Sequence, residues 1–296
     1  MIAPSDLNAL LTNTASLFEN IHYFECATSS IKGKSSRGAA ITYADLVERR
    51  ADFVNELRIS ICNWVFSESK FNAMLQEELA VRGHSMANAS ARIVELARSK
   101  FRSGFPQGQF GELLLFNFIQ HFFKAAPILR KMPITTNPSV ERHGADAIHV
   151  GFDAENPILY LGEAKTYSSK YKFSSAFEAA VDSIIKSHDE IHSELNLYVF
   201  DEFIEPPFID FAKKIKRNEI SLKTELVSVI SYEETGSVQG ADEKEIKKKM
   251  QQMVSDRLNA LDPNYFSGMN PHVVSRMHFF VLPFWGLEGL LKEFEK

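Results

Sequence analysis

Helix-like and strand-like segments alternate from residue 109 onward, and this alternation constrains the fold more than any other feature of the chain. A strongly apolar helix is predicted over 109–124, two strands within 128–150, and a third strand over 158–165. An amphipathic helix over 175–192 and a strand over 195–200 follow. The order helix–strand–strand–strand–helix–strand predicts an α/β sandwich.

The N-terminal third of the chain has a different pattern. Apolar residues recur near the 3.6-residue period over about 43–100, which predicts helices there. Residues 28–38 are rich in Ser, Gly and Lys and predict a mobile loop, and the Gly and Pro residues of 101–109 mark a boundary. We therefore predict a mainly helical N-terminal region, 1–104, followed by an α/β domain with C-terminal additions, 105–296.

The additions after residue 200 are predicted from their patterning. Residues 225–232 and 277–284 are apolar runs typical of strands. Residues 242–260 form a charged, helix-like segment, and a short helix is predicted after the last strand.

Composition and charge limit the class of protein. The chain has 296 residues, of which 45% are hydrophobic and 24% charged, as in an ordinary globular protein. Its formal net charge of −5 means that any nucleic-acid contact needs a local basic patch. Cys26 and Cys62 have no metal-site spacing, and no leader-like or membrane-spanning stretch is present. These features predict a soluble, cytoplasmic protein.

Two charged residues end the apolar strand in ILYLGEAKTY (158–167). Residues two apart on a strand share a face, so Glu163 and Lys165 lie on the same side as Leu159 and Leu161. Burying such charges is costly unless they are satisfied. Three other acid–x–Lys triplets lie in polar, helix-like contexts: Glu68–Lys70, Asp242–Lys244 and Glu245–Lys247. Only the triplet of Glu163 and Lys165 ends a buried strand.

A second acid precedes this triplet on the neighbouring predicted strand. Asp146, in HGADAIHV (143–150), stands 17 residues before Glu163, which leaves room for a strand, a turn and a returning strand. Two adjacent carboxylates repel and raise each other's pKa, and a divalent cation such as Mg²⁺ or Mn²⁺ removes that penalty. Such a metal activates water and polarises a phosphoryl group, while Lys165 orients the water or stabilises charge on the phosphate.

Glu112 is a third candidate ligand, on the helix predicted over 109–124. It lies off the polar face formed by Asn117, Gln120 and His121, in line with apolar residues. Two explanations remain open. Glu112 either joins the acidic site or favours the positive end of the helix dipole.

The element order, Asp146 and the triplet Glu163-Ala164-Lys165 resemble the restriction-endonuclease-like PD-(D/E)xK nucleases over about residues 105–232. Ala145 stands where that superfamily usually has Pro. More narrowly, HGADAIHV, LYLGEAKTY and FSSAFEAAVDSI resemble the HamA family, the nuclease subunit of the Hachiman anti-phage defence system. This resemblance implies a DNA substrate and a large superfamily 2-type helicase partner (HamB-like). It implies active-site roles for Asp146, Glu163 and Lys165, and Glu112 is a weaker match.

We therefore predict a Mg²⁺- or Mn²⁺-dependent DNA nuclease that acts with a helicase in anti-phage defence. In this prediction Asp146, Glu163 and Glu112 hold the metal. An alternative is a catalytically inactive, nuclease-fold DNA-binding or regulatory subunit of a helicase complex. A third reading is an α/β protein with an incidental ion pair, which metal binding would separate from the other two.

Overall fold

The computed structural model describes residues 7–26, 31, 33, 35–101, 106–130, 144–154, 156–169, 172–198, 204, 206–217, 219–220 and 222–296. Its strands are β1 (Ile21–Glu25), β2 (Ser35–Ile41), β3 (Tyr43–Ala44), β4 (Val47–Glu48), β5 (Ala126–Pro127), β6 (Ala147–Asp153), β7 (Asn156–Tyr167), β8 (Lys223–Glu233) and β9 (Met277–Phe284). Its helices are α2 (Ala15–Phe18), α3 (Arg50–Ile59), α4 (Ile61–Val65), α5 (Glu68–Ala80), α6 (Met86–Arg98), α7 (Gln107–Phe123), α8 (Phe173–Tyr198), α9 (Ile209–Lys216), α10 (Glu243–Asn259), α11 (Pro271–Val274) and α12 (Leu287–Glu295).

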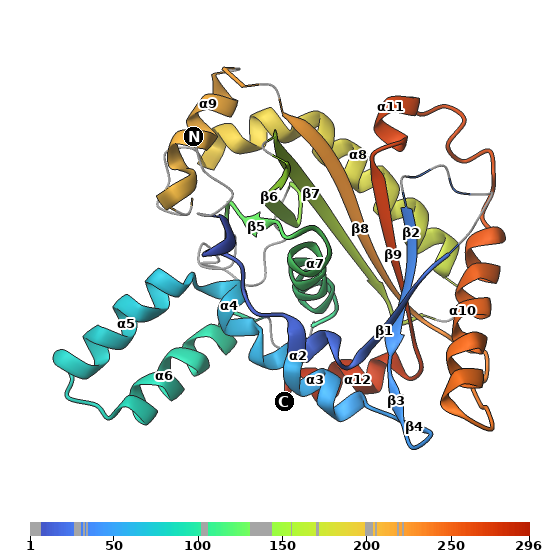
Figure 1. The fold of residues 1–296 in the computed structure, drawn as a ribbon, viewed down its shortest axis with the longest axis horizontal. Coiled ribbons are helices and arrows are strands. Elements are labelled where there is room, and N and C mark those ends of the chain that lie inside the picture. The colour runs from blue at the N-terminus through green and yellow to red at the C-terminus, as the bar shows by residue number, and fades with distance from the viewer. Residues whose placement is uncertain are drawn as a thin grey trace.

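One mixed sheet runs through the molecule, with the strand order β1-β2-β9-β8-β7-β6-β5 (Figure 1). β2, β9, β8 and β7 are parallel to one another. β1 pairs antiparallel with β2 at one end, and β6 pairs antiparallel with β7 and β5 at the other. The long strand β7 therefore separates the parallel block from an antiparallel hairpin.

Helices cover both faces of this sheet. Along β7, Leu159 and Leu161 belong to the apolar cluster that contains the buried side chains of α8. Ile158 and Tyr160 point the other way, into the cluster of α7, α3 and α12. This alternation follows from the two-residue period of a strand. Figure 1 shows α7 and α8 on opposite sides of the sheet.

The predicted α/β fold class is confirmed, and the order α7-β5-β6-β7-α8-β8 gives the expected helix–strand–strand–strand–helix–strand core. One predicted strand is wrong. Residues 195–198 of the predicted strand 195–200 are the last turn of α8, and the core strand after that helix is β8. A short apolar run fits a buried strand or a buried helix equally well, so periodicity could not decide. The second strand expected within 128–150 falls partly on 131–143, which lie outside the described residues.

The N-terminal helices are confirmed as α3 to α6, but the same region also adds two strands to the central sheet. β1 and β2 form one end of the sheet, and Ser35–Gly38 of the predicted mobile loop lie in β2. A Cβ at Gly38 would overlap the ring of Phe24 on β1, so this Gly lets an aromatic side chain cross the strand. The division at residue 104 stays a prediction.

α7 is enclosed on nearly all sides. Eleven of its residues are buried, including Asn117 and Gln120 of the face that the sequence suggests is polar. That face binds the N-terminal segment: Gln120 Oε1 accepts from Thr12 N–H at 3.0 Å, and Thr14 Oγ contacts His121 Nδ1 at 3.1 Å. These polar residues therefore satisfy a buried contact rather than facing water. Within the described part of the chain, no helix combines the length and apolar character needed to cross a bilayer.

Candidate active site

The pairing of β6 with β7 brings Asp146 and Glu163 together. Ala147, the first residue of β6, lies opposite Gly162, and Asp146 immediately precedes the strand. Asp146 N–H donates to the Gly162 carbonyl at 2.9 Å, so Asp146 and Ala147 both lie against Gly162. The Asp146 carboxylate accepts from Ala164 N–H at 2.8 Å, which places it beside Glu163.

Glu163 and Lys165 form a close ion pair on the same face of β7. Glu163 Oε1 lies 2.7 Å from Lys165 Nζ. The Glu163 side chain is only 4% exposed, whereas the Lys165 side chain is 30% exposed. The pair therefore spans the boundary between the apolar interior and solvent. A buried carboxylate is satisfied by an ammonium that a ligand in solution can still reach.

Burial and neighbouring acids act together on Asp146. Burial is the largest cause that raises the pKa of Asp146 well above its ordinary value, and the charges of Glu163 and Glu112 raise it further. The hydrogen bond from Ala164 N–H and the charge of Lys165 act in the opposite direction and do not offset the increase. The charge of Glu112, on α7, therefore acts on Asp146.

Lys165 is held in its charged form. Burial lowers the pKa of Lys165, but the charge of Glu163 and its hydrogen bond raise it by more, with further help from Asp146 and Tyr167. The net shift is upward. Lys165 is thus a fixed positive charge beside two carboxylates, suited to binding an anion or a polar hydrogen-bond acceptor and not to accepting a proton.

The acids are near one another without forming a finished metal site. Among the described residues, no three His, Cys, Asp or Glu side chains are already gathered as a set of metal ligands. Asp146 lies close enough to both other acids for the charges of Glu163 and Glu112 to raise its pKa. This donor set fits a hard divalent cation, since carboxylate oxygens are its preferred ligands and bound positive charge would relieve the repulsion.

α7 approaches β7 closely beside these residues. A Cβ at Gly111 would lie 2.6 Å from Thr166 Oγ1 and 3.2 Å from the Cβ of Ala164. The Thr166 hydroxyl is buried without a hydrogen-bond partner in the described part of the chain. Further toward the N-terminus of α7, Gln107 Nε2 donates to Ser168 Oγ. These contacts between α7 and β7 fix the position of Glu112 relative to Lys165. The sequence pattern did not indicate a role for Gly111, Thr166 or Ser168.

The fold and the site together define a class of protein. The chain is a mixed α/β protein with a core consistent with a nuclease-like fold, carrying neighbouring carboxylates and a lysine where an antiparallel hairpin meets a parallel sheet. A model of the HamA family matches residues 16–296, nearly the whole chain. The chain therefore belongs to the HamA family, as the resemblance in the sequence predicts. That membership supports a protein of Hachiman anti-phage defence. No curated protein matches the chain.

Proposed function

We propose that this protein is a metal-dependent DNA nuclease that hydrolyses phosphodiester bonds. The observation that carries the proposal is the Asp146 carboxylate held at the Ala164 N–H, next to Glu163, with Lys165 paired to Glu163 at 2.7 Å. A structural ion pair needs one acid and one base. Here a second carboxylate lies beside the pair and a third raises its pKa, which is an expensive arrangement unless a cation joins it.

Asp146, Glu163 and Glu112 would hold Mg²⁺ or Mn²⁺. A bound ion of this type lowers the pKa of a water ligand and polarises a phosphoryl oxygen. Glu163 lies on β7 and Glu112 on α7, and Asp146 immediately precedes β6 and is tied to β7 by its hydrogen bonds to Gly162 and Ala164. Sites on rigid elements hold their geometry more exactly than sites on loops.

Lys165 has a distinct role in this proposal. Its side chain is partly exposed and its pKa is raised, so it presents a permanent ammonium to solvent. With a cation held by Glu163, Lys165 would be free to contact the phosphate or the attacking water. Preorganised positive charge at this position stabilises the charge that develops on a phosphoryl group.

One observation favours the alternative of a nuclease-fold subunit that does not cut. Glu163 is already paired with Lys165, and no three acids are gathered as ligands among the described residues. In that case the acidic site would serve only to bind DNA or to regulate a helicase. Metal binding without cleavage would identify this alternative.

The decisive experiment uses plasmid DNA, Mg²⁺ and the purified chain, with and without a HamB-like helicase. We expect cleavage by the wild type and at least a ~100-fold loss in Glu163→Gln and in Lys165→Ala. The matched controls are Glu68→Gln and Lys70→Ala. They make the same changes in another acid–x–Lys triplet, which is exposed on α5. Equal cleavage by wild type and site variants would contradict the assignment.

We also propose that a large helicase partner controls the activity. The formal net charge of −5 gives weak non-specific attraction to DNA, so the chain alone should load slowly. A partner that binds DNA would raise the local substrate concentration without adding catalytic residues. Co-purification of the two proteins tests the contact, and cleavage in the presence of ATP and DNA ends tests the control. Cleavage that is unaffected by helicase and ATP would reject this part of the proposal.

A further inference from the structure

A cavity of about 330 Å³ lies among helices α3, α4, α6, α7 and α12. It is lined by residues at the C-terminal ends of α3, α6 and α12, by Ile61 at the start of α4 and by Pro106, which precedes α7. None of its lining residues is a carboxylate of the acidic site. Its volume is within the range of about 300–1,000 Å³ that is typical of small-molecule sites.

The inner wall of the cavity is apolar and aromatic. Phe294 and Ile61 are buried and form part of this wall. The ring of Phe101 also lines it, and lies 5.7 Å from the ring of Phe294 and 5.3 Å from that of Trp64, edge to face in both pairs. Aromatic packing on two sides fixes the Phe101 ring. A rigid ring at a cavity wall is a surface on which a planar ligand can stack.

Two arginines supply positive charge to the same cavity. Arg58 makes no hydrogen bond or ion pair with any residue in the described part of the chain. Arg98 binds the exposed Glu95 through Nη1 at 3.0 Å, and its side chain is 39% exposed. Both guanidinium groups are therefore able to offer N–H donors to an anion bound in the cavity.

Helix dipoles explain part of this arrangement. Arg58 and Arg98 lie in the last turns of α3 and α6, where a cation stabilises the helix end. That role needs only a charge near the terminus. It does not explain the aromatic side chains that line the same cavity, and Glu295 is the only acidic side chain among the described lining residues.

We propose that this cavity binds a planar aromatic ring that carries an anionic group, which is the chemistry of a nucleoside monophosphate. The ring would stack at Phe101, and the phosphate would accept hydrogen bonds from Arg58 and Arg98, whose guanidinium groups suit phosphate oxygens. The ligand is either a free nucleotide or one nucleotide unit of a DNA strand. The second source rests on the proposed function: Pro106 lies six residues before Glu112, about 9 Å along the axis of α7, a distance that a DNA strand bound at the acidic site could span.

The test is calorimetry of the full chain in EDTA, with deoxyadenosine monophosphate, deoxyadenosine and inorganic phosphate as separate probes. We expect deoxyadenosine monophosphate to bind at least tenfold more tightly than either fragment. Binding should fall at least tenfold in the double variant Arg58→Gln/Arg98→Gln. It should be unchanged in Arg92→Gln, an exposed arginine of α6 outside the cavity.

A 5′-phosphorylated oligonucleotide separates the two sources of the ligand. Tighter binding of the oligonucleotide, lost in the double variant, indicates a nucleotide of the DNA strand, and preference for the monophosphate indicates a free nucleotide. Ser99→Trp, which fills the cavity and retains both arginines, should abolish binding and decides the question if the double variant is unfolded. Binding that these variants do not change, no binding of either ligand, or equal affinity for phosphate alone overturns the proposal. Since metal is absent, these results do not depend on whether the acidic site cleaves DNA.

Discussion

The carboxylate of Asp146 accepts a 2.8 Å hydrogen bond from the backbone N–H of Ala164, the residue between Glu163 and Lys165. This bond fixes the first acid of the site to the peptide that carries the other two charged groups. The Asp146 carboxylate therefore cannot move away from Glu163 without breaking this hydrogen bond. The structure holds two carboxylates together in spite of their repulsion, which is the basis of the first prediction.

Asp146→Asn should stabilise the metal-free protein at pH 8 and remove its response to metal. The folded-state pKa of Asp146 is raised, so the ionised carboxylate destabilises the fold above that pKa, and the cost disappears as pH falls toward the ordinary value. Asn retains an oxygen for the Ala164 N–H. Thermal unfolding should show a higher Tm for the variant at pH 8 and no difference attributable to this charge at pH 3.5.

Metal provides the control for this prediction. Mg²⁺ or Mn²⁺ at millimolar concentration should raise the Tm of the wild type by mass action, and should leave Asp146→Asn unchanged. Glu245→Gln, at an exposed ion pair on α10, should respond to metal as the wild type does. A metal-dependent rise of equal size in Asp146→Asn would show that the ion binds elsewhere.

The contact of Gly111 with Thr166 gives a second prediction. Gly111→Ala would place a Cβ 2.6 Å from Thr166 Oγ1, so α7 and β7 must separate or Thr166 must rotate in a packed interface. We expect a loss of about 1–3 kcal/mol in the free energy of unfolding and reduced cleavage, because Glu112 and Lys165 lie on the two elements. Urea unfolding and the plasmid assay measure both effects.

Gly108→Ala is the matched control in the same helix. No atom lies within 4 Å of a Cβ at Gly108, so this change should be neutral or stabilise α7 by up to about 1 kcal/mol. Thr166→Ala added to Gly111→Ala should recover part of the lost stability by removing the clashing hydroxyl. If Gly111→Ala and Gly108→Ala behave alike, the close approach of α7 to β7 does not constrain the site.

The arrangement of Asp146, Glu163 and Lys165 could be predicted from sequence because it depends on local rules. The two-residue period puts Glu163 and Lys165 on one face, and a 17-residue separation permits one hairpin. The contribution of Glu112 could not be decided, since it depends on where α7 packs against the sheet. The same limit applies to β2, whose Ser35–Gly38 resemble a loop and pair only because β9 and β1 lie beside them.

His149 gives a prediction about acid sensitivity. Burial is the main cause that lowers the pKa of His149 to about 3, and Nδ1 contacts the Ala125 carbonyl at 3.0 Å. The unfolded chain binds a proton below about pH 6.5, whereas the folded chain does not, so stability falls as pH falls. The contribution is about 1.4 kcal/mol per pH unit below pH 6.5.

His149→Asn isolates this effect, because its amide can donate to the Ala125 carbonyl and does not titrate. Urea unfolding at pH 7.5 and 5.5 should show a smaller loss in the variant than in the wild type, by about 1.4 kcal/mol. The variant is expected to be less stable at both pH values, because Asn fills less of the buried site. The quantity to compare is therefore the change in the free energy of unfolding between pH 7.5 and pH 5.5. Parallel pH profiles would mean that another group causes the acid sensitivity.

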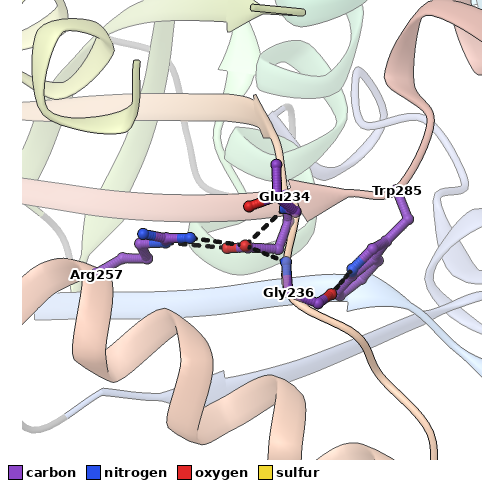
Figure 2. Close-up of polar contacts among 5 residues, drawn as sticks. Glu234, Gly236, Arg257 and Trp285 are labelled. Carbon is purple, nitrogen blue, oxygen red and sulfur yellow. Dashed lines mark hydrogen bonds and ion pairs between the residues drawn. The ribbon is translucent and has the colours of Figure 1, made fainter. Parts of the chain in front are cut away.

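The last prediction concerns the end of β8, where Glu234 is buried beside Arg257 of α10 (Figure 2). Glu234 Oε1 accepts from Arg257 Nη2 at 2.8 Å and from the N–H groups of Thr235 and Gly236 at 2.7 and 2.8 Å. Arg257 Nε donates to the other carboxylate oxygen at 3.1 Å. Trp285 Nε1 donates to the Gly236 carbonyl at 2.6 Å, so the ends of β8 and β9 are linked at the same point.

Arg257→Ala should destabilise the protein by about 2–3 kcal/mol, because it leaves a carboxylate buried without its cation, and the partial exposure of Arg257 keeps the loss below that of a fully buried pair. Glu234→Gln should cost less, since its amide oxygen can still accept from the two N–H groups, and the double variant should recover part of the Arg257→Ala loss.

The contribution of this ion pair to stability should depend on pH. Burial raises the pKa of Glu234, but the hydrogen bonds of Arg257 and the backbone lower it by more. The ion pair therefore stabilises the fold above the ordinary pKa of Glu, and this stabilisation is lost as pH falls. Urea unfolding at pH 7 and 4 should therefore show the Arg257→Ala deficit shrinking at pH 4, with Arg92→Ala on exposed α6 as the control. A deficit that is equal at both pH values, or that Glu234→Gln does not relieve, would show that Arg257 stabilises α10 by packing alone.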